Sequence, residues 1–379
     1  MEYYLDNSAT TRVCPEAAQA CVKAMEETYG NPSSLHRMGY RAEQLVRQAS
    51  EQLGAALSCA PEDIIYTSGA TEANNLALFG VMKAYARQGK TLITTAIEHP
   101  SISETAEELA RRGFRVKRLP PLPDGTYSPR QFAEALDEDT VLVSCMLVNN
   151  ETGLELPVEE IARTIKRLKP EVLIHTDGVQ AFLRQPIKLR SSGIDLMSIS
   201  GHKVRAPKGI GALYVHRGIR LLPRLYGGGQ QKGIRSGTEP VPLIAALGAA
   251  AAAQKDSVRQ ERSRFSALKE RLAAACREIA GVTMSPVGEG YAPHIATLSL
   301  RGIRSEVLLH FLEQYGIYVS SGSACSRGKQ SPVLEALGVD RQTADETIRV
   351  SFGAETTEEA VDELAVRLEE ALHTLAKVR

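Results

Sequence analysis

Between about residues 63 and 217, short apolar runs alternate with amphipathic segments. The runs read DIIYT, TLITTAI, TVLVSCMLV, VLIHTD, DLMSIS and GALYV. Apolar runs of this kind between helices are typical of parallel strands buried on both faces, because a strand with one solvated face alternates apolar and polar residues. The pattern therefore predicts an α/β domain built on a mostly parallel sheet.

The pattern changes near residue 241. Residues 241–280 form an Ala-rich and then charged stretch that predicts one or two long helices. After it, IATLSL and TIRVSFG read as strands, while EVLLHFLEQYG and the segment from residue 357 read as helices. We therefore expect a smaller α+β unit after the α/β domain.

Composition excludes several classes of protein. Lys and Arg number 45, as do Asp and Glu, so bulk charge gives no support for direct nucleic-acid binding. No apolar run approaches the length of a membrane span, and the first residues, MEYYLDNSATTR, lack the features of a signal peptide. The six cysteines include no C-x-x-C pair, which argues against a zinc site and a disulfide framework. We expect a cytoplasmic protein without a metal site.

One cysteine has an unusual setting. The stretch SSGSACSRGKQSP, residues 320–332, has no hydrophobic period and carries Cys325 just before Arg327 and Lys329. Its Gly, Ser and Pro residues predict a loop, whereas free cysteines are usually buried. Ser331 and Pro332 are expected as the N-cap and first residue of a helix over PVLEAL, with Gly338 as its C-cap.

Two motifs of the α/β domain could bind an anionic, ring-containing ligand. In TSGATEANN, residues 67–75, a strand is followed by a helix near Thr71, and free N–H groups at a helix start bind phosphate. The same letters also suit an ordinary capped helix. Asp177 ends the run VLIHTD, where α/β sheets place ligand groups. It could hold a protonated ring nitrogen, or it could cap the next segment.

Lys203, His99 and Arg349 are each ambiguous when taken alone. Lys203 follows a strand and a Ser-Gly-His turn, and a desolvated lysine can form a Schiff base, although most loop lysines are solvated. His99 follows TLITTAI, where a lone histidine is usually structural. Arg349 lies inside an apolar strand, either as an edge residue or as a planar clamp for a carboxylate.

Taken together, these motifs are far more specific. A phosphate-binding turn, a strand-end aspartate and then a lysine resemble pyridoxal phosphate enzymes of the aspartate-aminotransferase fold, which is fold type I. The motifs LDNSATT, GNPSS, SGATEANN, EHPSI, VNNETG, HTDGVQ, SGHK, RSGTEP, SSGSAC and IRVSFG closely match the cysteine desulfurase family of the NifS/IscS type, a class V aminotransferase family. The resemblance covers essentially the whole chain.

The resemblance implies a domain division and a set of site residues. The larger, cofactor-binding domain is expected over residues 13–257, and the smaller one over 1–12 and 258–379, with a mobile cysteine loop at about 321–330. Lys203 would bind pyridoxal 5'-phosphate covalently, Cys325 would accept sulfur and His99 would stack on the ring and assist proton transfer. The other expected cofactor contacts are Ala70, Thr71, Asn150, Asp177, Gln180, Ser200, His202 and Thr238. Arg349, helped by Asn150, would bind the substrate carboxylate.

The same resemblance implies a reaction and partners. L-cysteine would be converted to L-alanine, and its sulfur would pass to the Cys325 thiolate as a persulfide. Thr238 would reach the phosphate of the other subunit of a homodimer. An iron–sulfur scaffold or a tRNA-thiolating enzyme would then receive the sulfur, and the residues after Cys325 leave the identity of this acceptor open.

Other functions remain to be distinguished. A selenocysteine lyase or another class V aminotransferase would share most motifs, although an aminotransferase needs no loop cysteine. A Cys-His hydrolase would leave the cofactor motifs unexplained. A non-catalytic sulfur-handling scaffold would not need an intact Lys203, Asp177 and Cys325.

Overall fold

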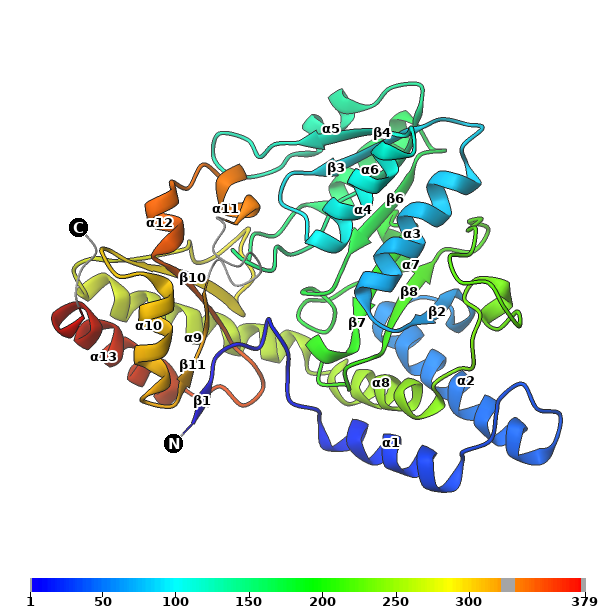
Figure 1. Ribbon diagram of the computed structural model, residues 1–379, viewed down its shortest axis with the longest axis horizontal. Coiled ribbons are helices and arrows are strands. Elements are labelled where there is room, and N and C mark those ends of the chain that lie inside the picture. Colours follow the sequence, from blue (N-terminus) through cyan, green and yellow to red (C-terminus); the bar gives the residue numbers. More distant parts are fainter. Residues whose placement is uncertain (1, 322–330, 376–379) are drawn as a thin grey trace.

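The computed structural model describes residues 2–321 and 331–375. It consists of two sheet-based units side by side (Figure 1). The larger sheet has the strand order β2 (Ile64–Thr67), β8 (Gly211–Val215), β7 (Leu196–Ser200), β6 (Leu173–Asp177), β5 (Thr140–Ser144), β3 (Thr91–Thr95) and β4 (Arg115–Leu119). Within it, β8 alone runs antiparallel to its neighbours β2 and β7. This mostly parallel sheet confirms the predicted α/β architecture.

Helices cover both faces of the larger sheet. They are α1 (Pro15–Glu27), α2 (Arg37–Leu57), α3 (Ala70–Ala84), α4 (Pro100–Arg111), α5 (Pro129–Ala135), α6 (Val158–Leu168), α7 (Leu189–Ser192) and α8 (Val241–Gln254). Successive residues along a strand point to opposite faces of the sheet. Leu92 and Leu142 join the core with α3 and α4, whereas Ile93 and Val143 join the core with α2, α6 and α8. This two-sided burial explains why the strands read as continuous apolar runs.

Strand β4 has a different character from the other strands. Its sequence is RVKRL, and it lies at the edge of the sheet beside β3. Charged side chains on an edge strand prevent pairing with another chain. The charges also hide this strand from a search for apolar runs.

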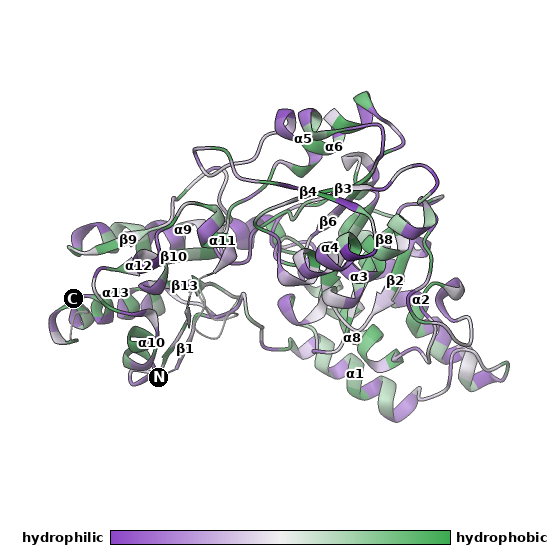
Figure 2. Cartoon of the chain, turned by 45° about the horizontal axis from the view of Figure 1, so that its top comes forward, coloured by the Kyte–Doolittle hydropathy of each residue, from purple (hydrophilic) through white to green (hydrophobic). Residues whose placement is uncertain are grey.

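The smaller unit surrounds a four-stranded sheet with the order β12 (Ser320–Ser321), β13 (Thr347–Ser351), β10 (Ile295–Leu300) and β9 (Val282–Met284). Its helices are α9 (Val258–Glu278), α10 (Ser305–Glu313), α11 (Pro332–Ala336), α12 (Arg341–Asp345) and α13 (Glu358–Thr374). The stretch 241–280 thus forms two helices. Hydrophobic residues are concentrated on α8, which lies among α1, α2 and the sheet (Figure 2).

The N-terminal segment connects the two units. Strand β1 (Tyr3–Tyr4) pairs with β11 (Ile317–Tyr318), and the Ser351 N–H donates to the Leu5 carbonyl. A few residues later, the Thr11 N–H donates to the His202 carbonyl beside the larger sheet. The exact domain boundaries at residues 12/13 and 257/258 stay a prediction.

Within the described part of the chain, no helix combines the length and the hydrophobicity that crossing a membrane requires. The same residues contain no cluster of three or more histidine, cysteine or acidic side chains placed to hold a metal ion.

Candidate active site

Three of the predicted site residues lie at the carboxyl ends of parallel strands of the larger sheet. Asp177 is the last residue of β6, Lys203 ends a short 3-10 helix (Gly201–Lys203) directly after β7, and His99 lies between β3 and α4. Carboxyl ends of parallel strands meet at one edge of a sheet, which is where α/β proteins bind ligands. The charges of both Asp177 and Lys203 act on the pKa of His99, so the three side chains share one site.

Asp177 is buried and held by neutral donors. Its side chain Oδ2 accepts a 2.8 Å hydrogen bond from Asn74 Nδ2, and its Oδ1 accepts one of 3.0 Å from the Val179 N–H. A buried carboxylate is costly unless a cation pairs with it. The arrangement therefore suits a ligand that brings a positive charge to Asp177.

His99 is fixed by the start of α4. The Ser101 N–H donates to His99 Nδ1 at 3.1 Å, and the Ser101 hydroxyl lies 2.8 Å from the same nitrogen. Because Nδ1 accepts, the neutral ring carries its hydrogen on Nε2. Burial lowers the pKa of His99, and the Lys203 charge lowers it further against the opposing effect of Asp177. His99 is therefore a neutral imidazole at neutral pH, with Nε2 available for exchange of a proton.

Lys203 is oriented by the N-terminal segment. Its Nζ donates to the carbonyl oxygens of Ser8 at 2.6 Å and Ala9 at 2.7 Å. Gln180 Nε2 donates to the same Ser8 carbonyl at 3.1 Å. The segment that also pairs with the smaller unit therefore determines where the amine of Lys203 lies.

Three of the predicted phosphate-binding residues, Ala70, Thr71 and Ser200, lie at the start of α3. Helix α3 begins at Ala70, followed by Thr71, and no side chain caps it. The Ser200 hydroxyl lies near Gly69, since a Cβ built on Gly69 would come within 3.9 Å of it. His202 Nδ1 is 3.3 Å from the Thr10 hydroxyl, and burial lowers its pKa to about 4. The uncapped helix start, with its free N–H groups, suits a phosphate.

Arg349 comes from the smaller unit and reaches across to the larger one. Its Nη2 donates to Asp6 Oδ1 at 2.9 Å and to the Ser320 hydroxyl at 3.0 Å. Its Nη1 donates to the Asn150 carbonyl at 2.9 Å. Its Nε is buried without a partner among the described residues. The guanidinium is thus fixed in position and still keeps a donor for a ligand.

Comparison with known proteins identifies the family. The model of the class-V aminotransferases matches residues 3–364. The chain belongs to the class-V aminotransferase family. A "NifS/IcsS protein homolog" of Lactobacillus delbrueckii subsp. bulgaricus is 39% identical over 99% of this chain and 98% of its own. The "Cysteine desulfurase IscS" of Pectobacterium carotovorum subsp. carotovorum is 40% identical over 95% of this chain and 90% of its own. A solved "NIFS-LIKE PROTEIN" superposes with a TM-score of 0.93 at 36% identity, covering 99% of this chain and all of that one.

Class-V aminotransferases use pyridoxal phosphate, and the residues present here fit that group. Asp177 offers a buried carboxylate to the protonated ring nitrogen, and Lys203 offers an amine at the same sheet edge. The Asn150 Oδ1 is buried without a partner among the described residues. An orphaned buried oxygen of this kind needs a donor that the chain itself does not supply.

Cys325 lies outside the described residues, as do Arg327 and Lys329 and most of the loop predicted at about 321–330. The residues on either side of that segment are described. Ser320 is paired with Arg349 in the smaller sheet, and Ser331 donates from its hydroxyl to Glu151, the neighbour of Asn150. Both ends of the segment that contains Cys325 therefore lie close to Arg349 and Asn150, the two residues predicted to bind the substrate.

The predicted helix after this segment is confirmed. The Ser331 hydroxyl accepts hydrogen bonds from the N–H groups of Val333 and Leu334, and Pro332 is the first residue of α11. The helix ends at Ala336, one residue before the end of PVLEAL, and Gly338 follows with φ +75°.

Among the described residues, Thr238 makes no hydrogen bond to another predicted site residue. It is exposed in the loop before α8. Arg235, three residues earlier in the same loop, pairs with Glu72 in the first turn of α3. Its expected contact with the phosphate of another subunit stays a prediction.

Several residues of the site were not found from the sequence. Asn74 joins Asp177 to Ser101, and the carbonyl of Ser8 joins Lys203 to Gln180. Asp6 forms an ion pair with the guanidinium of Arg349. The paired asparagines in TEANN, polar residues on a helix turned toward a sheet, were a usable signal for Asn74. No sequence signal exists for a backbone carbonyl such as that of Ser8.

Proposed function

We propose that this protein is a pyridoxal phosphate-dependent cysteine desulfurase that converts L-cysteine to L-alanine and keeps the sulfur on Cys325 as a persulfide. A relative named "Cysteine desulfurase IscS" and one named "NifS/IcsS protein homolog" each match this chain over 90% or more of their own length. The observation that carries the proposal is that residues 6–9 contact both Lys203 and Arg349, and that Arg349 also bonds to Ser320, just before the segment that contains Cys325.

Arg349 and Asn150 would bind the substrate. The unpartnered Nε of Arg349 suits the α-carboxylate of an amino acid, and its existing bonds to Asp6 and Ser320 hold the guanidinium in place. A charge-assisted hydrogen bond of this kind orients a substrate more sharply than a neutral one.

Lys203 and His99 would move protons. When bound, pyridoxal phosphate supplies an electron sink for the charge that develops next to the amino group. The Nζ of Lys203 would take the proton from the substrate Cα, guided by the Ser8 and Ala9 carbonyls. His99 would hold or release a proton at Nε2, because its Nδ1 is occupied by Ser101.

Cys325 would take the sulfur. Its thiolate attacks the substrate sulfur, an S–S bond forms, and the bond between the substrate Cβ and its sulfur breaks. The electron pair and a proton go to the Cβ, so the products are alanine and a Cys325 persulfide. No outside oxidant is needed, because the carbon is reduced as the sulfur is oxidised.

The enzyme is also proposed to be a homodimer. Thr238 would meet the cofactor phosphate of the partner subunit. The large side chains of Tyr29, Leu35, Tyr40 and Tyr226 are exposed, and a partner subunit that covered any of them would remove apolar surface from water.

Delivery to an iron–sulfur scaffold or a tRNA-thiolating enzyme, and a cytoplasmic location, complete the proposal. The five described cysteines, Cys14, Cys21, Cys59, Cys145 and Cys276, are free thiols. Free thiols suit a reducing compartment.

The central experiment compares the parent enzyme with Cys325→Ser, and Cys21→Ser serves as a matched control at a half-buried thiol. We expect Cys325→Ser to bind the cofactor and L-cysteine, but to lose alanine formation and the mass increase of one sulfur atom. Cys21→Ser keeps both. Alanine release by Cys325→Ser at the parent rate would disprove the role of this cysteine.

A further inference from the structure

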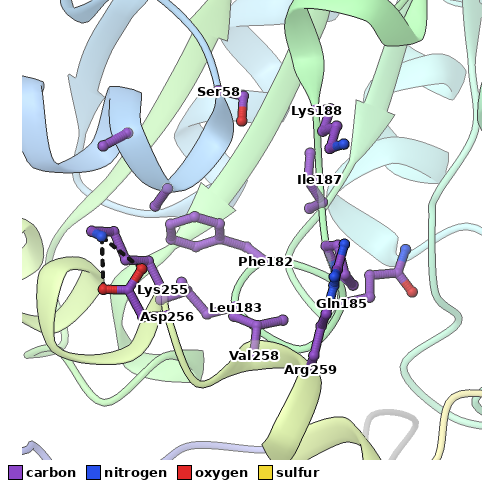
Figure 3. Close-up of a pocket in the computed structure, with 13 residues that line it drawn as sticks. Ser58, Phe182, Leu183, Gln185, Ile187, Lys188, Lys255, Asp256, Val258 and Arg259 are labelled. Atoms are coloured by element: carbon purple, nitrogen blue, oxygen red, sulfur yellow. Dashed lines mark hydrogen bonds and ion pairs between the residues drawn. The ribbon is translucent and has the colours of Figure 1, made fainter.

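A separate cavity lies between the end of α2, the segment 182–188 and the junction of α8 with α9 (Figure 3). Its volume is about 360 Å³. It is lined by Ala55, Ala56, Ser58, Phe182, Leu183, Gln185, Pro186, Ile187, Lys188, Lys255, Asp256, Val258 and Arg259. None of these residues belongs to the predicted active site. The size is that of a site for a small organic molecule.

The floor of this pocket is apolar. The ring of Phe182 faces the space and is itself almost fully buried, with Leu183 and Val258 beside it (Figure 3). Opposite, Ala55 and Ala56 on α2 have side chains too small to fill the space. An apolar floor that includes an aromatic ring gives a favourable place to the apolar body of a ligand of similar size.

The backbone of the floor is strained. Leu183 has φ +57°, a left-handed conformation that a bulky residue rarely adopts. The two residues next to it are fixed, since Phe182 is packed and Arg184 donates from Nη2 to the Lys203 carbonyl at 3.3 Å. Strain of this kind persists at ligand sites, where surrounding contacts hold it.

The rim of the pocket is positive. Lys188 and Arg259 are exposed, and within the described ranges neither side chain has an ion pair or hydrogen bond. The one carboxylate, Asp256, has both oxygens 2.8 Å from the Lys255 Nζ, so its charge is already compensated. The uncapped start of the 21-residue α9 contributes Val258 and Arg259 to the same lining, and helix starts attract anions.

We propose that this pocket is a second ligand site, which binds a small organic anion with an apolar, ring-sized body. The carboxylate or phosphate of the ligand would meet Lys188, Arg259 and the start of α9, and the body would lie on Phe182 and Leu183. One wall of the pocket belongs to the same turn of the chain as Gln180 and Arg184. Gln180 bonds to the Ser8 carbonyl and Arg184 to the Lys203 carbonyl, so an occupant would touch a segment that also contacts the active site.

A fluorescent reporter can test binding directly, because the chain has no tryptophan. Ala55→Trp places a single indole at the exposed side of the pocket. The cofactor-loaded variant is titrated with phenylacetate, phenyl phosphate, benzyl alcohol and inorganic phosphate. We expect saturable binding of the two aromatic anions, about tenfold tighter than benzyl alcohol or inorganic phosphate. Whichever of phenylacetate and phenyl phosphate binds more tightly identifies the head group, carboxylate or phosphate, that the site prefers.

Charge variants then locate the anion contact. In the same reporter background, Lys188→Gln with Arg259→Gln weakens phenylacetate binding about tenfold or more. The matched control is Arg217→Gln, an exposed arginine away from the pocket, which leaves binding unchanged. Equal binding by the double variant, or benzyl alcohol as tight as phenylacetate, would overturn the anion assignment.

A second measurement avoids the introduced tryptophan. Saturation-transfer NMR on the unmodified enzyme detects phenylacetate, and Ala56→Phe fills the space next to Phe182 and removes the signal. A signal that persists in a folded Ala56→Phe protein, or no signal in the parent, would refute the site. None of these measurements uses cysteine turnover, so failure here leaves the desulfurase proposal intact.

Discussion

The side-chain amide of Asn74 links the carboxylate of Asp177 to the hydroxyl of Ser101, with both hydrogen bonds 2.8 Å long. Ser101 in turn contacts His99 Nδ1. One buried asparagine on α3 therefore orients both the carboxylate expected at the ring nitrogen and the imidazole expected over the ring. Since each amide hydrogen has one acceptor, neither contact can be replaced by the other.

Asn74→Ala is expected to weaken cofactor binding about tenfold, because it leaves Asp177 Oδ2 and the Ser101 hydroxyl without a buried donor, at a cost of about 1–3 kcal/mol. Equilibrium dialysis of pyridoxal phosphate measures this effect. Asn75→Ala is the matched control, since Asn75 is the next residue and, within the described part of the chain, its side chain bonds only to the Thr71 carbonyl in its own helix. An equal loss in both variants would mean that the helix, not the amide, is responsible.

Arg349→Lys is expected to raise KM for L-cysteine at least tenfold and to leave cofactor binding unchanged. A lysine keeps the charge but cannot contact Asp6, Ser320 and Asn150 as the planar guanidinium does. Steady-state kinetics and absorbance of the bound cofactor separate the two effects. Arg301→Lys, at an exposed arginine of the smaller unit, should match the parent; an unchanged KM in Arg349→Lys would remove this residue from the substrate site.

His175 makes folding stability depend on pH. It is fully buried between Ser144 and Ser198, and burial lowers its pKa to about 3. Below pH 6.5, the ordinary pKa of histidine, His175 binds a proton in the unfolded chain but stays neutral in the folded protein. The free energy of unfolding therefore falls as pH drops from about 6.5 toward 3, by up to about 1.4 kcal/mol per pH unit.

Urea unfolding of the parent and of His175→Asn at pH 7 and pH 5 checks this prediction. The difference between the two pH values should shrink in His175→Asn. It should stay unchanged in His310→Asn, whose side chain is 74% exposed. An equal pH difference in all three proteins would contradict the burial argument.

Glu98 acts in the opposite sense. Its carboxyl is buried, accepts from Thr95 and from the Met146 N–H, and burial raises its pKa to about 8. Between its ordinary value near 4.5 and 8 the folded protein holds a proton that the unfolded chain releases. Glu98 therefore lowers the free energy of unfolding as pH rises through that range, by up to about 1.4 kcal/mol per pH unit.

Glu98→Gln keeps the accepting oxygen and removes the ionisation. We expect its free energy of unfolding, relative to the parent, to improve between pH 5 and pH 8. Glu104→Gln, at an exposed carboxylate on α4, is the control and should show no such trend. A parallel pH profile for Glu98→Gln and the parent would show that Glu98 is already ionised in the folded protein.

Much of the architecture followed from residue patterns. The runs at β3, β5, β6, β7 and β8 were recognised because burial on both faces makes them uniformly apolar. Strand β4 was missed because, at the edge of the sheet, its face can carry three charges. The order of strands and the antiparallel β8 depend on long-range pairing, which local patterns do not encode.

The site was accessible to sequence reasoning where a side chain has a distinctive chemistry. Lys203, Asp177 and His99 could be placed at one sheet edge because each follows an apolar run. The contacts that position them could not be foreseen in the same way. The carbonyls that hold Lys203 belong to Ser8 and Ala9, which are far from it in the sequence. Their role depends on main-chain geometry alone.

The N-terminal segment also has a consequence for synthesis on the ribosome. Residues 3–6 are made before Lys203, yet they are fixed by β11 and β13, which are made after it. A nascent chain that already contains Lys203 therefore has its lysine but lacks the fixed carbonyl oxygens that aim it. The reactive amine acquires its final position only after β11 and β13 have been made, so a product that stops before β11 would be a poor catalyst even with its larger sheet fully folded.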